Sequence, residues 1–143
     1  MICFLLDTDT ISLLQRQDER VQTFLESLPT VAVGVSVISY QEQVQGRLAW
    51  LVKARTSRER ERAYQLLADT PVFFAEFPIV NFTEAATRRF EELTSLKLNV
   101  GPNDLRIAAT ALEIGAAVVT RNQRDFSRVP GLRVETWVGK ESR

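Results

Sequence analysis

The chain alternates between short apolar runs and longer segments whose apolar residues recur every three or four positions. Continuous apolar runs of about four to eight residues are typical of buried strands, whereas the wider spacing predicts amphipathic helices. Strands are predicted in four ranges: 2–6, 31–35, 116–119 and 132–138. Helices are predicted in six ranges: 11–14, 21–28, 42–52, 58–67, 84–93 and 105–114. This alternation predicts an α/β fold, with a central parallel sheet flanked by helices on both faces.

Local signals at the ends of these segments support the predicted boundaries. Thr56 with Glu59, and Ser39 with Glu42, have the spacing of a capping box. Gly115 is suited to end the helix before it. A length of 143 residues fits one domain with a real core better than two. We therefore expect a single domain over residues 1–138 and a mobile tail over residues 139–143.

The composition is that of an ordinary globular protein, with 45% hydrophobic and 25% charged residues. No segment has the apolar length that a bilayer span requires. The apolar start over residues 1–6 has no basic residues and no small-residue cleavage pattern, unlike a signal peptide. We therefore expect a cytoplasmic protein that makes no membrane contact. The single cysteine, Cys3, has no intramolecular disulfide partner and is expected to pack in the core.

Four carboxylates stand where a strand-like run gives way to a turn or a helix start: Asp7, Glu42, Asp104 and Asp125. The crevice of an open α/β sheet lies outside the carboxyl ends of its strands, so all four are expected at one edge. Asp104 also continues a helical stripe of apolar residues: Ile107, Ala108, Ala111 and Ile114. A carboxylate on a buried face has to be hydrogen-bonded, paired or bound to metal.

Each acidic residue also has a purely structural interpretation. Asp7 and Asp9 could cap the following helix, and Glu42 could complete the capping box with Ser39. Asp125 could form a turn with Asn122, and Asp104 could be a first-turn charge behind Asn103 as the N-cap. The functional interpretation therefore depends on the convergence of all four carboxylates.

The residue types that the chain lacks restrict the general bases and metal ligands that it can use. The chain has no histidine and one cysteine, which excludes a histidine general base and a zinc site built from thiolates or imidazoles. Oxygen ligands suit magnesium and manganese, which lower the pKa of a bound water and polarise a phosphoryl oxygen. The sequence therefore predicts a magnesium- or manganese-dependent hydrolase of phosphodiester bonds.

Four segments, in this order and spacing, carry a family resemblance: residues 4–10, residues 36–42 with Gly46, residues 103–109, and residues 119–126 with 129–132. They resemble a PIN-domain protein of the VapC toxin type. The resemblance implies a PIN fold, a magnesium-dependent endoribonuclease, a cognate antitoxin that masks the site, and a homodimer. It makes Asp7, Glu42, Asp104 and Asp125 the metal-binding set, with Thr120 and Asn122 as polar supports. Asp9 is expected to be a helix cap or a supporting group. Residues 43–47 are more polar than in many relatives.

Eighteen basic and eighteen acidic residues cancel, so net charge does not indicate a nucleic-acid binder. Most of the basic residues are arginines, which suit bidentate phosphate contacts. The candidates for contact with RNA phosphates around the acidic crevice are Arg55, Arg58, Arg62, Arg121 and Arg124. In the alternative interpretation the first three belong to a surface helix and pair with Glu59 and Glu61.

Two other functions are compatible with parts of the sequence. Residues 7–10 also resemble the nucleophile motif of haloacid-dehalogenase-type phosphatases, in which Asp7 would be phosphorylated. That mechanism needs a well-placed lysine and a late acidic pair, and the only lysines are Lys53, Lys97 and Lys140. The other function is a non-catalytic PIN-like module that binds RNA or a protein. Four convergent negative charges argue against a pure binder of polyanions.

Overall fold

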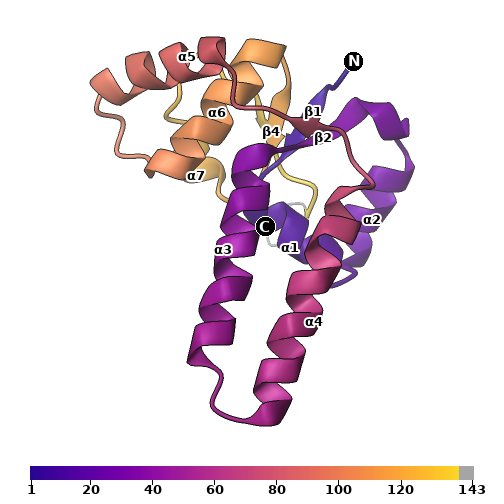
Figure 1. The fold of residues 1–143 in the computed structure, drawn as a ribbon. Coiled ribbons are helices and arrows are strands. Elements are labelled where there is room, and N and C mark those ends of the chain that lie inside the picture. Colours follow the sequence, from indigo (N-terminus) through magenta and orange to yellow (C-terminus); the bar gives the residue numbers. More distant parts are fainter. Residues whose placement is uncertain (139–143) are drawn as a thin grey trace.

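The computed structural model describes residues 1–138 and contains one parallel sheet over that range (Figure 1). Its strands are β1 (Phe4–Leu6), β2 (Val33–Ser36), β3 (Ile79–Val80), β4 (Ala117–Val119) and β5 (Val134–Glu135). They lie in the order β3-β2-β1-β4-β5, and each neighbouring pair is parallel. The expected mobile tail over residues 139–143 lies outside the described residues.

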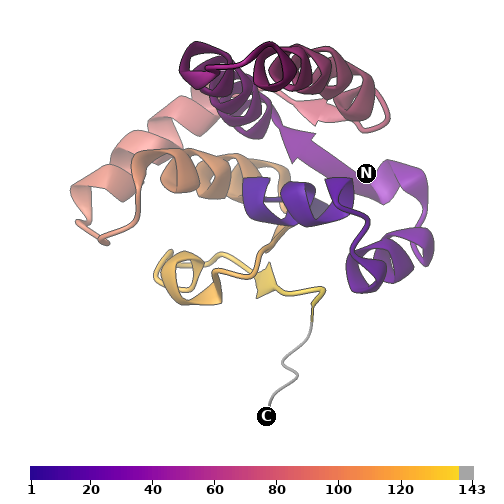
Figure 2. The ribbon, with the colours of Figure 1, turned by 90° about the horizontal axis from the view of Figure 1, so that it is seen from below.

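Helices connect the strands and cover both faces of the sheet. They are α1 (Thr8–Gln15), α2 (Glu19–Glu26), α3 (Val37–Lys53), α4 (Ser57–Phe74), α5 (Glu84–Ser95), α6 (Pro102–Ile114) and α7 (Gln123–Phe126), with a 3-10 turn at Thr30–Ala32. Figure 2 shows α2 on one side of the sheet and α5 on the other. Helices α3 and α4 form a hairpin that extends away from the sheet (Figure 1). The predicted α/β fold is confirmed.

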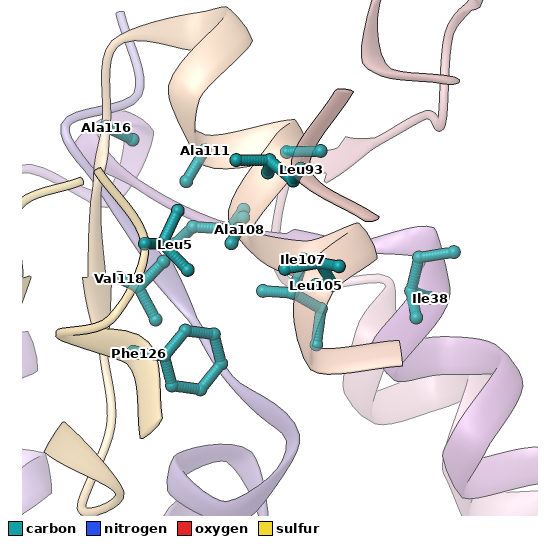
Figure 3. Close-up of a cluster of buried hydrophobic side chains, with 12 residues drawn as sticks. Leu5, Ile38, Leu93, Leu105, Ile107, Ala108, Ala111, Ala116, Val118 and Phe126 are labelled. Carbon is teal, nitrogen blue, oxygen red and sulfur yellow. The ribbon is translucent and has the colours of Figure 1, made fainter. Parts of the chain in front are cut away.

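Alternate residues of the strands pack on opposite faces of the sheet. Leu5 and Val118 pack with α6 in one apolar core, whereas Leu6 and Val119 belong to a second core on the other face. Figure 3 shows the first of these cores, in which Ala108 and Ala111 of α6 lie close to the sheet. Because these alanines are small, α6 can pack closely against β1 and β4.

Some predicted boundaries were wrong. The strand expected at residues 31–35 begins only at Val33, because residues 30–32 form the 3-10 turn. The strand expected at residues 132–138 is reduced to the two residues of β5. Strand β3 was not predicted, since it has only two residues and neither is fully buried. The helix expected from residue 58 to 67 continues through Pro71 to Phe74.

The ends of the helices show which of the predicted capping motifs form. Thr56 and Glu59 form the predicted capping box, and Gly115 ends α6 with a φ of 72°, so both predictions are confirmed. The prediction of a capping box between Ser39 and Glu42 was wrong. Helix α3 begins at Val37 with Ser36 as its N-cap, so Glu42 lies inside the helix and not in its first turn.

Cys3 is exposed, so the prediction that it packs in the core was also wrong. It precedes β1 at the amino edge of the sheet, outside the part of the strand whose side chains are buried. Within residues 1–138, no helix combines the length and the apolar character needed to cross a bilayer.

Candidate functional site

The predicted acidic residues are carried by elements that meet at the carboxyl edge of the sheet. β1 leads directly into Asp7, which is the N-cap of α1 and accepts a hydrogen bond from Thr10 N at 2.8 Å. β2 leads into α3, which carries Glu42. Helix α6 runs antiparallel to the strands because it leads into β4, so its first turn, with Asp104, lies at the same edge.

These elements border an open acidic pocket of about 690 Å³. Its lining residues are Asp7, Thr8, Asp9, Glu42, Asp104, Arg121 and Asn122. The fourth predicted carboxylate, Asp125, does not line the pocket, but its charge acts on Asp104. The structure thus brings Asp7, Glu42 and Asp104 together and places Asp125 beside them.

The negative charges of these carboxylates repel one another. Burial, and after it the charges of Asp7, Glu42 and Asp125, together raise the pKa of Asp104 to about 6. Burial also raises the pKa of Asp7, whose side chain is only 4% exposed, although hydrogen bonds from Thr120 and Thr10 lower it. Within residues 1–138, no arginine or lysine forms an ion pair with Asp7 or Asp104. The pocket therefore holds negative charge that the surrounding side chains do not neutralise.

Glu42 is held by side chains from two other helices. Thr8 of α1 donates a hydrogen bond to Glu42 Oε1 at 2.5 Å, and the Thr8 and Ser39 hydroxyl oxygens lie 3.0 Å apart. Asn103 of α6 donates to Glu42 Oε2 at 3.2 Å. Both carboxylate oxygens thus have a donor, which fixes the direction of this side chain.

Asp125 is held by the segment that the resemblance marked as supporting. Asn122 Nδ2 donates to Asp125 Oδ2 at 2.9 Å, and Asn122 N donates to Thr120 Oγ1 at 2.8 Å. Arg128 pairs with Asp125 Oδ1 at 3.1 Å. Asn122 is the N-cap of α7, so this segment forms a short helix where the sequence suggested a turn.

Asp9 is bound by Arg121 in a two-pronged ion pair. Arg121 Nε and Nη2 donate to the two oxygens of Asp9 at 2.7 and 2.9 Å. The hydrogen bond from Arg121 holds the pKa of Asp9 below its ordinary value. Asp9 therefore lines the pocket as an ion-paired neighbour of Asp7. The N-cap of α1 is Asp7 and not Asp9, and the supporting role expected of Asp9 stays a prediction.

The donor chemistry of the pocket fits a hard divalent cation, because its ligands would be carboxylate oxygens whose charges repel one another. Over residues 1–138, however, no three acidic, histidine or cysteine side chains lie close enough together to hold a metal ion as they stand. Glu42 and Asp125 are turned toward their own hydrogen-bond donors. A bound cation would have to draw these carboxylates inward.

The predicted RNA-binding arginines do not form one group. Arg121 lines the acidic pocket, but Arg58 and Arg62 line a separate cavity between α3 and α4. This hairpin extends away from the sheet in Figure 1. Arg55 precedes the N-cap of α4, and Arg124 lies in α7, outside the residues that line the pocket. Arg58 and Arg62 lie four positions apart on α4 and share a face, whereas Arg55 precedes the helix. None of the three lines the acidic pocket, and their contact with RNA stays a prediction.

Sequence reasoning missed the residues that orient Glu42: Thr8, Ser39 and Asn103. Asn103 was considered only as an N-cap, but the N-cap of α6 is Gly101. The available signal was helical phase, since Ser39 and Glu42 are three positions apart and share a face of α3.

Comparison with known proteins gives a consistent result. Residues 4–132 match the PIN domain family. The chain is 32% identical to the tRNA(fMet)-specific endonuclease VapC of Salmonella typhimurium, over 96% of this chain and 99% of that protein. Among solved structures, DNA-bound VapBC from Salmonella typhimurium superposes with a TM-score of 0.76 at 30% identity, over 96% of this chain and 99% of that chain. VapBC-5 from Mycobacterium tuberculosis, described as a member of a family of toxin-antitoxin systems, has a TM-score of 0.62 at 26% identity, over 95% and 98% of the two chains.

Proposed function

This chain belongs to the PIN domain family and to its VapC ribonucleases, and from that premise we propose that it is a divalent-metal-dependent endoribonuclease. We place the hydrolysis of RNA phosphodiester bonds in the acidic pocket at the carboxyl edge of the sheet. The observation that carries this proposal is the meeting of Asp7, Glu42 and Asp104 in one pocket, where no described arginine or lysine forms an ion pair with any of the three. The raised pKa of Asp104, caused by burial and by these neighbouring charges, agrees with it.

In this proposal Asp7, Glu42, Asp104 and Asp125 hold the metal, magnesium or manganese. When bound, such an ion lowers the pKa of a water and stabilises charge on a phosphoryl oxygen. The protein contributes the positions of the ligands. Asp7 is fixed by the start of α1 and by Thr10 N, and Asp104 by the packing of α6 on the sheet.

The surrounding side chains set the direction and charge of these ligands. Thr8 and Asn103 hold the two oxygens of Glu42, and Asn122 holds Asp125. Thr120 hydrogen-bonds to the buried Asp7 and favours its ionised form. These contacts are the kind of outer support that sets ligand orientation in metal sites.

The relatives also suggest partners. Because neighbouring structures are described as VapBC and as toxin-antitoxin systems, we place this chain as the toxin of such a pair, with a cognate antitoxin that covers the acidic pocket. RNA is its substrate in this proposal, and Arg121 and Arg124 are its candidate phosphate contacts nearest the pocket. The homodimer and the single domain over residues 1–138 stay predictions.

The rival phosphatase has less support. An aspartyl-phosphate mechanism at Asp7 needs a nearby lysine, and the described residues that line the acidic pocket include none. Lys53 lines the hairpin cavity instead. A non-catalytic binding module would keep its binding activity after the loss of one carboxylate, whereas an enzyme would lose cleavage. The effect of a carboxylate substitution therefore separates the two functions.

The direct test is RNA cleavage by Asp7→Asn and Asp104→Asn variants, with and without magnesium. Each variant should lose metal-dependent cleavage of tRNA, rRNA and mRNA pools, with a native circular dichroism spectrum. Asp69→Asn is the matched control, because Asp69 lies on α4, accepts a hydrogen bond from Gln65 and does not line the acidic pocket. Full cleavage by both site variants would show that the acidic pocket is not the catalytic site.

A further inference from the structure

A second pocket, of about 560 Å³, lies directly beside the acidic pocket. The two share Glu42 and Asp104 as lining residues. The remaining residues that line the second pocket are Gln41, Gln45, Gly101, Pro102, Asn103 and Arg106. We call it the amide pocket. Because Glu42 and Asp104 border both pockets, the amide pocket is within reach of an RNA strand whose phosphate lies at the carboxylates.

Two of the amide side chains are free to bind a ligand. Gln41 and Gln45 lie one turn apart on α3, which puts their Cβ atoms about 5–6 Å from each other. Both are exposed, and within residues 1–138 neither side chain has a hydrogen-bond partner. A primary amide presents a donor and an acceptor side by side, the pattern that matches the edge of a nucleobase.

Asn103, the third amide, has a different role because both ends of its side chain are engaged. Its Nδ2 donates to Glu42 Oε2 at 3.2 Å, and its Oδ1 accepts a hydrogen bond from Arg106 Nη1 at 2.8 Å. Asn103 therefore positions Glu42 and Arg106 and has little capacity left for a base.

Arg106 supplies a cation at the border of the negative site. Its guanidinium carbon lies 4.6 Å from the ring centroid of Phe90, and one of its five N–H groups is used by Asn103. Over residues 1–138, no carboxylate lies within ion-pair distance of Arg106. The packing on Phe90 fixes the guanidinium, and its remaining N–H groups are available to a phosphate.

We propose that the amide pocket binds the nucleotide next to the scissile phosphate, with Gln41 and Gln45 hydrogen-bonded to its base and Arg106 to its phosphate. This inference rests on the proposed ribonuclease function and adds a source of base preference to it. Phosphate contacts position a strand without reading its sequence, whereas amide contacts to base edges select the base.

The test compares the wild type with the Gln41→Ala/Gln45→Ala double variant on a random-sequence RNA pool. Two profiles are read by sequencing: the ends produced by magnesium-dependent cleavage, and the RNA retained by immobilised protein with calcium in place of magnesium. In both, we expect the wild type to enrich one base at one position by about fivefold or more. The double variant should lose this enrichment in both profiles.

Two further variants distinguish recognition of the base from electrostatic contact with the phosphate. Arg106→Gln should weaken binding of all sequences about equally and make its salt dependence shallower by about 0.7 in log–log slope. Gln22→Ala/Gln65→Ala removes two amides from α2 and α4 and should leave the base preference unchanged.

An unchanged preference in the Gln41→Ala/Gln45→Ala variant, or a wild type without any preference, would overturn the assignment of the amide pocket. A failure of the ribonuclease function would look different. In that case the retained RNA would still show the glutamine-dependent preference, but the wild type would make no magnesium-dependent cuts. That result would support the amide pocket as a nucleotide site.

Discussion

Thr8, the first residue of α1, donates a hydrogen bond to Glu42 of α3, 34 positions further along the chain. The contact links the helix that follows β1 to the helix that follows β2. Asp7 directly precedes Thr8. The start of α1 therefore positions the buried carboxylate of Asp7 and also orients the carboxylate of Glu42. Thr8 is therefore expected to affect the site without binding the metal itself.

Replacing Thr8 with valine keeps the shape of the side chain and removes its hydroxyl. Thr8→Val should lower kcat/KM for RNA by about 10–100-fold, because the orienting partner of a metal ligand is lost. Stability should change by no more than about 1 kcal/mol, since the residue is only partly buried. Cleavage and magnesium titration would measure the effect. Thr87→Val on α5 is the matched control, and equal activity of the two variants would contradict the role of Thr8.

Asp104 should make the metal-free protein less stable as pH rises. Its pKa is about 6 in the folded state and 3.8 ordinarily, so the folded state binds more protons than the unfolded state between these values. Stability should fall as pH rises from about 4 to 6 and stay lower above that. Asp104→Asn should therefore raise the free energy of unfolding in EDTA by about 1 kcal/mol at about pH 7.5, because solvent screens part of the effect.

Urea denaturation at about pH 4 and pH 7.5 would measure this difference, with Asp69→Asn as the control. Near pH 4 the wild type and Asp104→Asn should have similar stability, because Asp104 is protonated in the folded protein. A variant that is less stable than the wild type at the higher pH would mean that Asp104 is stabilised by an attractive partner.

The Asp9–Arg121 ion pair should weaken RNA binding by occupying the arginine. Asp9→Asn removes one negative charge from the pocket and releases a guanidinium whose Nε and Nη2 are bound to Asp9 in the wild type. We expect RNA to bind several-fold more tightly, with a log–log salt dependence steeper by about 0.7. Fluorescence anisotropy across a salt titration would measure both. A slope equal to that of the wild type would show that the released arginine does not contact phosphate.

The hairpin arginines should matter only for long RNA. Arg58 and Arg62 line the cavity between α3 and α4 and do not line the acidic pocket. Arg58→Glu should weaken binding of a tRNA several-fold and leave binding of a short oligonucleotide unchanged. Arg88→Glu on α5 is the control for the change of charge. Equal effects on long and short RNA would place Arg58 nearer to the cleavage site than the structure has it.

Strong local patterns made much of the fold predictable. The apolar run before Asp7 and the stripe of alanines after Asp104 each identify a single element, and both elements were found. Strand β3 could not be predicted, because two residues carry no periodicity. The start of α3 was misplaced because Ser39 with Glu42 has the spacing of a capping box, whereas Ser36 at the end of β2 makes the actual cap.

The sequence was enough to predict which carboxylates form the candidate site, but not which contacts orient them. Positions at strand ends indicated that Asp7 and Asp104 would meet, and they line one pocket. The contacts that hold Glu42 connect residues from three helices, and such contacts depend on how the helices pack. The same limit applies to Arg58 and Arg62, since the sequence does not reveal that α3 and α4 extend beyond the sheet.

The exposed Cys3 gives a practical route to several of these measurements. As the only thiol in the chain, and located before β1 at the amino edge of the sheet, it lies at the end of the strand opposite to Asp7. A maleimide dye attached there would mark every molecule once and leave the acidic pocket untouched. Labelled protein could then report RNA and antitoxin binding by fluorescence without engineering a new attachment point.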